Sequence, residues 1–198
     1  MNKSRVEAFT DAVLAIILTI MILEFKTPES FELKAITLQI PYLISYAVGY
    51  LFIGVAWYNH HYMFSKTKLV TKRIYWANNF WMFSTSFLPV ATSWIGEDLN
   101  AQGPQIFYAI IYTIWSASYI LLSYLIAKDN DEQGYKNVAK SIRQMKIYRY
   151  LTNWKYLLIQ TIVLIIILIY LPVLQIVLVL WQIIFIGSRT NPDSDKLF

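Results

Sequence analysis

Long apolar runs separated by short polar segments make up most of the chain. A bilayer core about 30 Å thick is crossed by roughly 20 apolar residues of helix, so runs of this length predict membrane-spanning helices. We expect six of them, at residues 6–25, 41–61, 74–95, 105–127, 153–170 and 172–188. The pattern therefore predicts an all-α, polytopic membrane protein in which residues 1–198 form one transmembrane domain.

The last apolar run is too long for one straight span. Residues 156–188 form 33 almost continuously apolar positions, which is about 50 Å of helix at 1.5 Å per residue. Pro172 disfavours helical geometry at Leu171 and suits the first turn of a new helix. We therefore expect a tight hairpin of two short spans, and one kinked, strongly tilted span is the alternative.

Composition narrows the class of protein further. Of the 198 residues, 57% are hydrophobic and 15% are charged, which leaves no room for a separate soluble domain. The absence of cysteine excludes disulfides, thiolate metal sites and a cysteine nucleophile. No small-residue cleavage site follows the first apolar run, so we interpret it as a retained helix.

Positive charge is concentrated in the segments expected on one side of the membrane. If the N-terminus is cytoplasmic, the inner segments hold fifteen of the seventeen Lys and Arg residues, Lys196 included. The outer segments keep only two basic residues, beside five acidic ones: Lys26, Lys34, Glu24, Glu29, Glu32, Glu97 and Asp98. This positive-inside pattern predicts a multi-pass protein of the cell membrane with both termini in the cytoplasm. Because the basic residues are spread over every inner segment, we expect no nucleic-acid partner.

The longest inner segment, residues 128–155, mixes basic and apolar residues. Such a pattern suits a helix that lies on anionic lipid, with its apolar side in the membrane. A solvated connector between two spans explains the same residues equally well. Both interpretations stay open at the level of sequence.

The first apolar run carries the unusual feature of an aspartate, Asp11. At 100° per residue, four of its other residues fall close to one stripe of the helix: Ile16, Thr19, Ile20 and Leu23. Asp11 and Glu7 lie on nearly the opposite side, so we expect both carboxylates to face neighbouring helices. Charged side chains in a membrane helix are usually paired or functional.

A candidate partner for Asp11 lies in the segment WYNHHY at the inner end of the second run, at the same depth. We expect Asp11 to pair with His60 or His61 in a hydrogen-bonded structural network. Adjacent histidines do not give the i, i+4 spacing of a helical zinc site, so we expect no metal.

Other polar and small residues are consistent with helix packing. The segment AVGYL at residues 47–51 is similar to part of a potassium-channel filter. Because Gly49 lies within a continuous apolar helix rather than an extended loop, we do not interpret the segment as a filter. We interpret Gly49 and Gly54 as close-packing positions between helices. Asn78 is expected to bind neighbouring helices, and Pro89 to kink the third span. No motif pairs a nucleophile with a base, so an enzyme is not predicted.

Arg5, Phe9, Thr10 and Asp11 fit the pattern R-x-x-x-F-[S/T]-D at the start of the first helix. This pattern resembles the signature of the lysosomal potassium channel family in its prokaryotic, single-repeat form. The segments WYNHHYMF and FLPVAT, and the six-span plan, are also similar to that family. Thr10 replaces the usual serine and keeps the hydroxyl.

The resemblance implies a homotetramer in which four copies of the first helix surround a central path for potassium ions, without a cofactor. Its pore positions correspond to Ile16, Thr19, Ile20 and Leu23. Arg5, Phe9 and Asp11 are implied to hold the inner end of that helix, beside a polar network that we expect to include Thr10, Trp57, His60, His61 and Asn78. The helical wheel agrees for Asp11 but places Arg5 near the pore stripe.

A mechanism follows for a channel without a carbonyl filter. Rings of Ile16 and Leu23 side chains would block ions by dewetting when narrow, and Thr19 hydroxyls would replace part of the hydration shell of potassium. Core packing is the plainer explanation of the stripe.

A proton-coupled secondary transporter or a proton-permeable channel is the alternative function, although a transporter usually shows broken helices or an inverted repeat and the sequence shows neither. We expect the protein to interact with membrane lipids and with other copies of the same chain.

Overall fold

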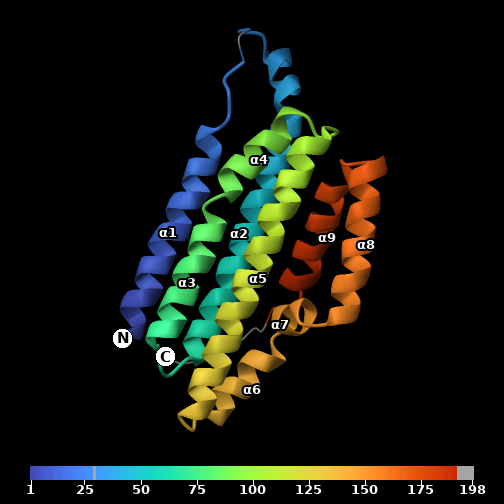
Figure 1. Cartoon of the computed structure of the whole chain (residues 1–198). Coiled ribbons are helices and arrows are strands. Elements are labelled where there is room, and N and C mark those ends of the chain that lie inside the picture. Colours follow the sequence, from blue (N-terminus) through green and yellow to red (C-terminus); the bar gives the residue numbers. More distant parts are fainter. Residues whose placement is uncertain (29, 191–198) are drawn as a thin grey trace.

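The computed structural model describes residues 1–28 and 30–190, and within them the chain is helical throughout its regular elements (Figure 1). The elements are α1 (Lys3–Leu23), a 3₁₀ helix η1 (Leu33–Gln39), α2 (Ile40–Lys66), α3 (Lys72–Thr85), α4 (Leu88–Glu97), α5 (Gln102–Glu132), α6 (Lys136–Gln144), α7 (Lys146–Leu151), α8 (Trp154–Tyr170) and α9 (Leu174–Gly187). This confirms the all-α prediction for the described residues. Glu29 and Lys196, which contribute to the predicted charge asymmetry, lie outside them.

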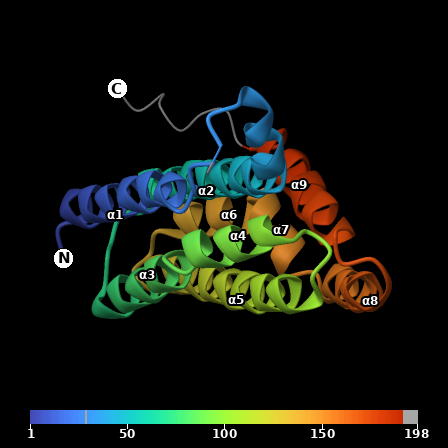
Figure 2. The ribbon, with the colours of Figure 1, turned by 90° about the horizontal axis from the view of Figure 1, so that it is seen from above.

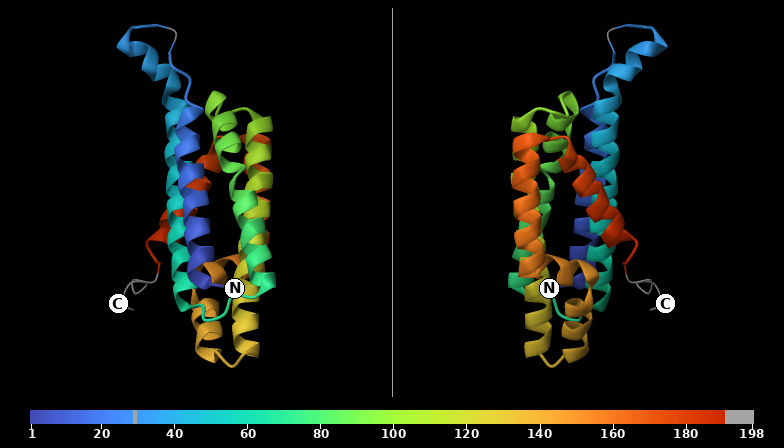
Figure 3. Two further views of the ribbon diagram at one scale, coloured as in Figure 1. Left: turned by 90° about the vertical axis from the view of Figure 1, so that its left-hand side faces the viewer. Right: turned by 90° about the vertical axis from the view of Figure 1, so that its right-hand side faces the viewer.

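The long helices run side by side in a bundle, and the short helices α6 and α7 lie at one end of it (Figure 1). Seen from above, α1 and α2 form one row, while α3, α4 and α5 form a second (Figure 2). The α8–α9 pair lies at the end of the bundle opposite α1, with α9 inclined against α8 (Figure 2, Figure 3). Three stretches are long and apolar enough to cross a membrane: Lys3–Leu23, Leu33–Lys66 and Gln102–Glu132.

The expected third span is broken rather than kinked. It consists of α3 and α4, and the helix is interrupted at Ser86 and Phe87, ahead of Pro89. Proline offers no N–H to the carbonyl four residues earlier, here that of Thr85, and its ring clashes with that carbonyl. The position of Pro89 in the first turn of α4 therefore gives the break a clear cause.

The hairpin predicted at Pro172 is present. α8 ends at Tyr170, Leu171 leaves helical geometry with φ −153° and ψ 74°, and α9 begins at Leu174. The two helices have 17 and 14 residues and pack against each other. A single kinked helix is thereby excluded.

The lipid-surface interpretation of the inner loop is not what the structure shows. α6 is strongly amphipathic, but its apolar residues Val138, Ala139 and Ile142 are buried, and the helix packs on the inner end of α5. The apolar side of α6 is thus covered by protein instead of lipid. The charged side of the same helix remains exposed.

The two glycines interpreted as packing positions differ. A Cβ atom at Gly49 would lie 2.5 Å from Met21 Cε and 3.0 Å from Thr92 Oγ1, so the absence of a side chain there allows α2 to approach α1 and α4. A Cβ at Gly54 would meet no described atom within 4 Å. The packing prediction is confirmed for Gly49 and wrong for Gly54.

Candidate functional site

The first helix has two unlike faces. One face carries five buried residues that pack on α2, α3 and α4: Val6, Thr10, Leu14, Ile17 and Met21. The predicted stripe lies on the other face, where Ile16, Ile20 and Leu23 are 56%, 42% and 77% exposed. Because the described residues leave these side chains largely uncovered, they do not belong to the core of the protomer, and the core-packing explanation of the stripe is wrong for the described part of the protomer.

Thr19 is an exposed polar position within this apolar stripe. Its Oγ1 donates a hydrogen bond to the carbonyl oxygen of Ile16, one turn earlier, at 2.9 Å. The hydroxyl hydrogen is therefore occupied by the helix itself, whereas the lone pairs of the oxygen stay available. Thr19 thus presents an acceptor to whatever faces α1, as a cation site requires.

A buried chain of hydrogen bonds joins three helices near the inner end of α1. Asn78 Nδ2 of α3 donates to Thr10 Oγ1 of α1 at 2.7 Å, and Thr10 Oγ1 donates to the carbonyl oxygen of Val6 at 2.8 Å. Asn78 Oδ1 lies 2.8 Å from His60 Nε2 of α2. Since the amide oxygen can only accept, His60 donates through Nε2. All these polar atoms are satisfied by one another, which fixes the relative positions of α1, α2 and α3.

The ring of His60 is held between two aromatic side chains. It stacks on Trp81 with 4.8 Å between ring centroids and on Phe64 with 4.3 Å. Trp81 in turn packs edge-on against Tyr119 of α5. The polar network of α1 is therefore anchored directly in the aromatic core.

Asp11 binds a residue that the sequence analysis did not propose as its partner, Trp57 of α2. Its Oδ1 accepts a hydrogen bond from Trp57 Nε1 at 2.8 Å, on the exposed side of the α1–α2 contact. His61 lies next to this pair, with its ring stacked on that of Trp57 at 5.6 Å. The prediction that Asp11 faces a neighbouring helix is confirmed. Of the two histidines proposed as its partner, His60 is excluded because Asn78 binds that ring, and the pairing with His61 stays a prediction.

Arg5 and Phe9 lie on the exposed side of α1, together with Ile16. The resemblance implied that both hold the inner end of the helix, but the buried side there is occupied by Val6 and Thr10. Within the protomer, the holding role therefore belongs to Thr10 and Asp11. Arg5 and Phe9 extend the open face of α1 towards its inner end.

A second polar cluster at the inner end was missed by the sequence analysis. Asp129 of α5 is buried and binds Arg73 Nη2 at 2.8 Å and the hydroxyl of Thr71. The neighbouring Asn130 accepts from the backbone N–H groups of residues 68 and 69 through Oδ1. These bonds fasten the α2–α3 connection to α5. Charged residues after an apolar span are normally solvated, so only the burial reveals this role.

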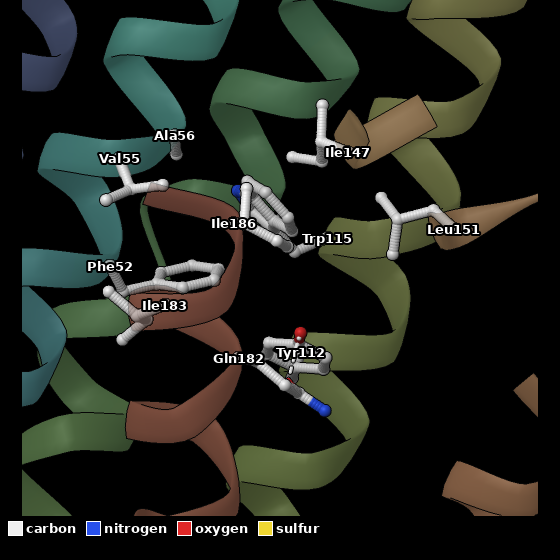
Figure 4. A pocket seen from close by; sticks show the side chains of 10 residues that line it. All are labelled: Phe52, Val55, Ala56, Tyr112, Trp115, Ile147, Leu151, Gln182, Ile183 and Ile186. Carbon is white, nitrogen blue, oxygen red and sulfur yellow. Dashed lines mark hydrogen bonds between the residues drawn. The ribbon is translucent and has the colours of Figure 1, made fainter. Parts of the chain in front are cut away.

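The interior of the bundle offers little space. A cavity between α2, α5, α7 and α9 has a volume of about 20 Å³, enough for one water molecule (Figure 4). Its lining is apolar except for Tyr112 and Gln182, and the Tyr112 hydroxyl donates to Gln182 Oε1 at 2.7 Å. A hydrated cation does not fit there. The open face of α1 is therefore a better candidate for an ion pathway than this cavity.

Comparisons with known proteins bear on the same regions. Residues 5–89 match the family described as the endosomal/lysosomal potassium channel TMEM175. A Chryseobacterium sp. protein named as a potassium channel is 38% identical over 134 residues, which cover 68% of this chain and 70% of that protein. A Streptomyces collinus protein, also named as a potassium channel, is 33% identical over 119 residues, 58% of each chain.

The fold is also known. The crystal structure of a lysosomal potassium-selective channel TMEM175 homologue from Chamaesiphon minutus superposes with a TM-score of 0.69 and covers 96% of this chain and 98% of that one, at 22% identity. The matched segment 5–89 includes Thr10, Asp11, Trp57, His60 and Asn78, which the structure connects in pairs. On these grounds the chain belongs to the TMEM175 family of endosomal/lysosomal potassium channels.

Proposed function

We propose that the protein is a potassium-permeable cation channel of moderate selectivity. Membership of the family supports this function, as do the two relatives named as potassium channels. The exposed stripe of α1 supplies apolar side chains together with one row of hydroxyl acceptors. These are the two components that a gate and a weak cation site need.

The pathway forms between copies of the chain. A homotetramer places four copies of α1 around one axis, with the stripe of each copy facing inward. Such an assembly has closed point-group symmetry, as most homo-oligomers do. Support comes from the one-sided packing of α1, whose other face the protomer leaves uncovered. The small volume of the inner cavity argues in the same direction.

Six spans carry the protomer across the cell membrane, with both termini in the cytoplasm. The α3–α4 pair acts as one broken span, and α8 and α9 act as two short ones, of about 26 and 21 Å at 1.5 Å per residue. Both are shorter than a bilayer core of about 30 Å, so the membrane is expected to thin around them. The start of α1 and the end of α9 lie at the α6 end of the bundle, as an even number of spans requires (Figure 3). The whole chain, residues 1–198, forms this single channel domain.

The conduction gate consists of the apolar rings of Ile16, Ile20 and Leu23, which exclude water when they are narrow. The Thr19 ring lies between them and supplies neutral oxygen ligands. Potassium loses its hydration shell more easily than sodium, so neutral hydroxyls favour potassium. Four hydroxyls are fewer ligands than a stack of carbonyl rings, and the selectivity is therefore moderate.

The inner network keeps the stripe aimed at the axis. Asn78 fixes α1 against α3 through Thr10, and Trp57 fixes it against α2 through Asp11. Rotation of α1 about its own axis would break both contacts. The gate therefore opens by displacement of whole helices, with these bonds retained.

A broken membrane helix is one feature that transporters use, and the α3–α4 break provides one. At that break, however, the hydroxyls are already occupied: Ser84 and Thr85 both donate to the carbonyl oxygen of Trp81. Trp115 Nε1 of α5 also donates to Thr85 Oγ1. The break is thus filled by the protein's own hydrogen bonds, and the channel remains the better supported function.

The observation that carries the proposal is the open face of α1 with Thr19 in the middle of an apolar stripe. Recording of single channels from purified protein, in bilayers with potassium and sodium on opposite sides, tests it. We expect unitary currents that grow with the gradient without saturation and that reverse at a potential set mainly by potassium. Coupled, saturable transport without unitary currents would instead support a proton-coupled transporter.

A further inference from the structure

A groove of about 440 Å³ lies between α8 and α9. This helix pair is at the end of the bundle opposite α1 (Figure 2). Its walls are apolar and include Ile159 and Val163 of α8 and Trp181 of α9. These three side chains remain exposed, so the protomer does not fill the groove itself. The volume lies within the range of ligand-binding pockets, and an apolar lining suits a hydrocarbon chain.

One end of the groove is polar. Tyr150 donates from its hydroxyl to Gln160 Oε1 at 2.9 Å, and burial raises the pKa of the Tyr150 phenol, so it stays a neutral donor. Gln182 is only 2% exposed, and its Oε1 accepts from Tyr112. Its Nε2 faces the Tyr150 hydroxyl but makes no hydrogen bond of normal geometry to any described residue. In Figure 4, this nitrogen points away from the apolar side chains of the inner cavity. A buried amide N–H without an acceptor costs free energy, so an acceptor is expected there.

The same end is positively charged. The guanidinium of Arg189 lies over the ring of Phe185, 4.0 Å from its centroid, and Phe185 lines the groove. Lys155 lies in the first turn of α8 at the same end, with its ammonium over the ring of Trp154. Residues 133–190 contain seven basic and no acidic residues. Basic pockets between membrane helices at the cytoplasmic surface are typical binding sites for anionic lipid headgroups.

We propose that the groove between α8 and α9 binds an anionic lipid of the inner leaflet. One acyl chain lies between Val163 and Trp181, and the headgroup lies beside Lys155 and Arg189. Ester or phosphate oxygens of the lipid supply the acceptor for the Gln182 amide. The site rests on the proposed membrane topology and is independent of ion conduction.

A second copy of the chain is the competing occupant of the groove. The arrangement of the helices favours lipid, because α1 and the α8–α9 pair lie at opposite ends of the protomer (Figure 2). If α1 faces the central axis, then the groove faces outward to the membrane. The unbalanced positive charge at its inner end also matches a lipid headgroup, whereas a second copy would bring the same positive charge to it.

Tryptophan quenching in vesicles tests the site. The protein is reconstituted in phosphatidylcholine with a small, equal fraction of either brominated phosphatidylglycerol or brominated phosphatidylcholine, because bromine in an acyl chain quenches a tryptophan that it touches. We expect stronger quenching by the anionic lipid, and Trp181→Phe should remove most of that excess. Each of Lys155→Gln and Arg189→Gln should weaken the preference for the anionic lipid about fivefold.

Lys136→Gln and Lys140→Gln are the matched controls, since these exposed basic residues of α6 do not line the groove. Both should keep the full preference. An excess that survives in Trp181→Phe, or weak quenching of Trp181 by both lipids because another copy covers it, would overturn the proposal. The assay measures no current, so a protein that shows the lipid preference without conducting would refute only the channel.

Discussion

The first helix and the α8–α9 hairpin are both apolar and both exposed in the protomer, but they are exposed in different ways. α1 buries one complete face, from Val6 to Met21, and leaves a single stripe open. α8, whose residues are all described, buries none of them. A helix that is fixed by hydrogen bonds and open on one side presents a defined surface, whereas a helix with most of its apolar side chains exposed suits contact with lipid.

The polar residues reinforce this difference. On α1, the polar side chains facing the bundle are tied to α2 and α3, and the single hydroxyl on the open stripe, that of Thr19, is oriented by its own helix. On α8 and α9, Gln160 and Gln182 lie beside Tyr150 at one end of the groove, where the bundle meets the basic inner segment. In the proposed function, the α1 stripe therefore faces a polar pathway and the hairpin faces the membrane.

The largest effect should come from the network that fixes α1. Asn78→Ala leaves the buried His60 Nε2–H without an acceptor and removes the hydrogen bond that Thr10 Oγ1 accepts, and we expect the free energy of unfolding to fall by about 2–5 kcal/mol. Denaturation in mixed micelles measures this change. Asn79→Ala is the control, because among the described residues the Asn79 amide donates to the carbonyl oxygen of Tyr75, within its own helix. Equal losses in the two variants would mean that the network does not fix α1.

The next effect distinguishes the two exposed surfaces by conductance. Leu23→Asn or Ile16→Asn replaces an apolar ring by a polar one, which removes the dewetting barrier and should raise the potassium conductance several-fold. Ile162→Asn makes the same kind of change on the exposed surface of α8 and should leave the unitary conductance unchanged. A rise in Ile162→Asn without one in the α1 variants would move the pathway to the hairpin.

Selectivity should respond to a single hydroxyl. Thr19→Val keeps the shape and deletes the oxygen, so it should lower the preference for potassium over sodium with the tetramer intact. Thr19→Ser keeps the oxygen and should retain most of that preference. Reversal potentials under bi-ionic conditions measure both variants, and an unchanged ratio in Thr19→Val would show that Thr19 does not face the ions.

The smallest effect concerns Asp11. Asp11→Asn keeps an acceptor for Trp57 Nε1 but loses the charge, and since the pair is exposed in the protomer we expect a loss of about 1 kcal/mol or less. Tetramer yield in detergent should fall slightly, with the assembled mass still near four times the 23.2 kDa chain. Potassium selectivity should not change, and an altered reversal potential at normal stability would contradict this role.

The sequence predicts those parts of the fold that depend on one helix at a time. The 3.6-residue period identifies the stripe of Ile16 and Leu23, and Pro172 identifies the hairpin, since both follow from local geometry. The contacts of His60 depend on how three helices pack, and no period reveals that Asn78 is its partner. From its charge alone, Asp129 would be expected to face solvent. Its ion pair with Arg73 forms only in the tertiary structure and cannot be predicted from the sequence.

The error at the third span has a local cause that was present in the sequence. Pro89 within an apolar run predicts a kink, but its lack of an N–H and its ring together can also end a helix. The hydroxyls of Ser84, Thr85 and Ser86 each bond a carbonyl of the same helix, which stabilises the end of α3 without a continuous helix. A row of hydroxyl residues before a proline is therefore a useful signal of a broken membrane helix.

Cysteine modification tests the pathway along α1 most directly, because the chain has no cysteine of its own. Single variants Thr19→Cys and Leu23→Cys place a thiol on the open stripe, Met21→Cys places one on the buried face, and Ile162→Cys places one on α8. We expect a charged thiol reagent to block the potassium current through Thr19→Cys and Leu23→Cys and to leave the other two unaffected. Modification of Leu23→Cys, verified by mass, with an undiminished current would contradict the assignment of this face to the ion pathway.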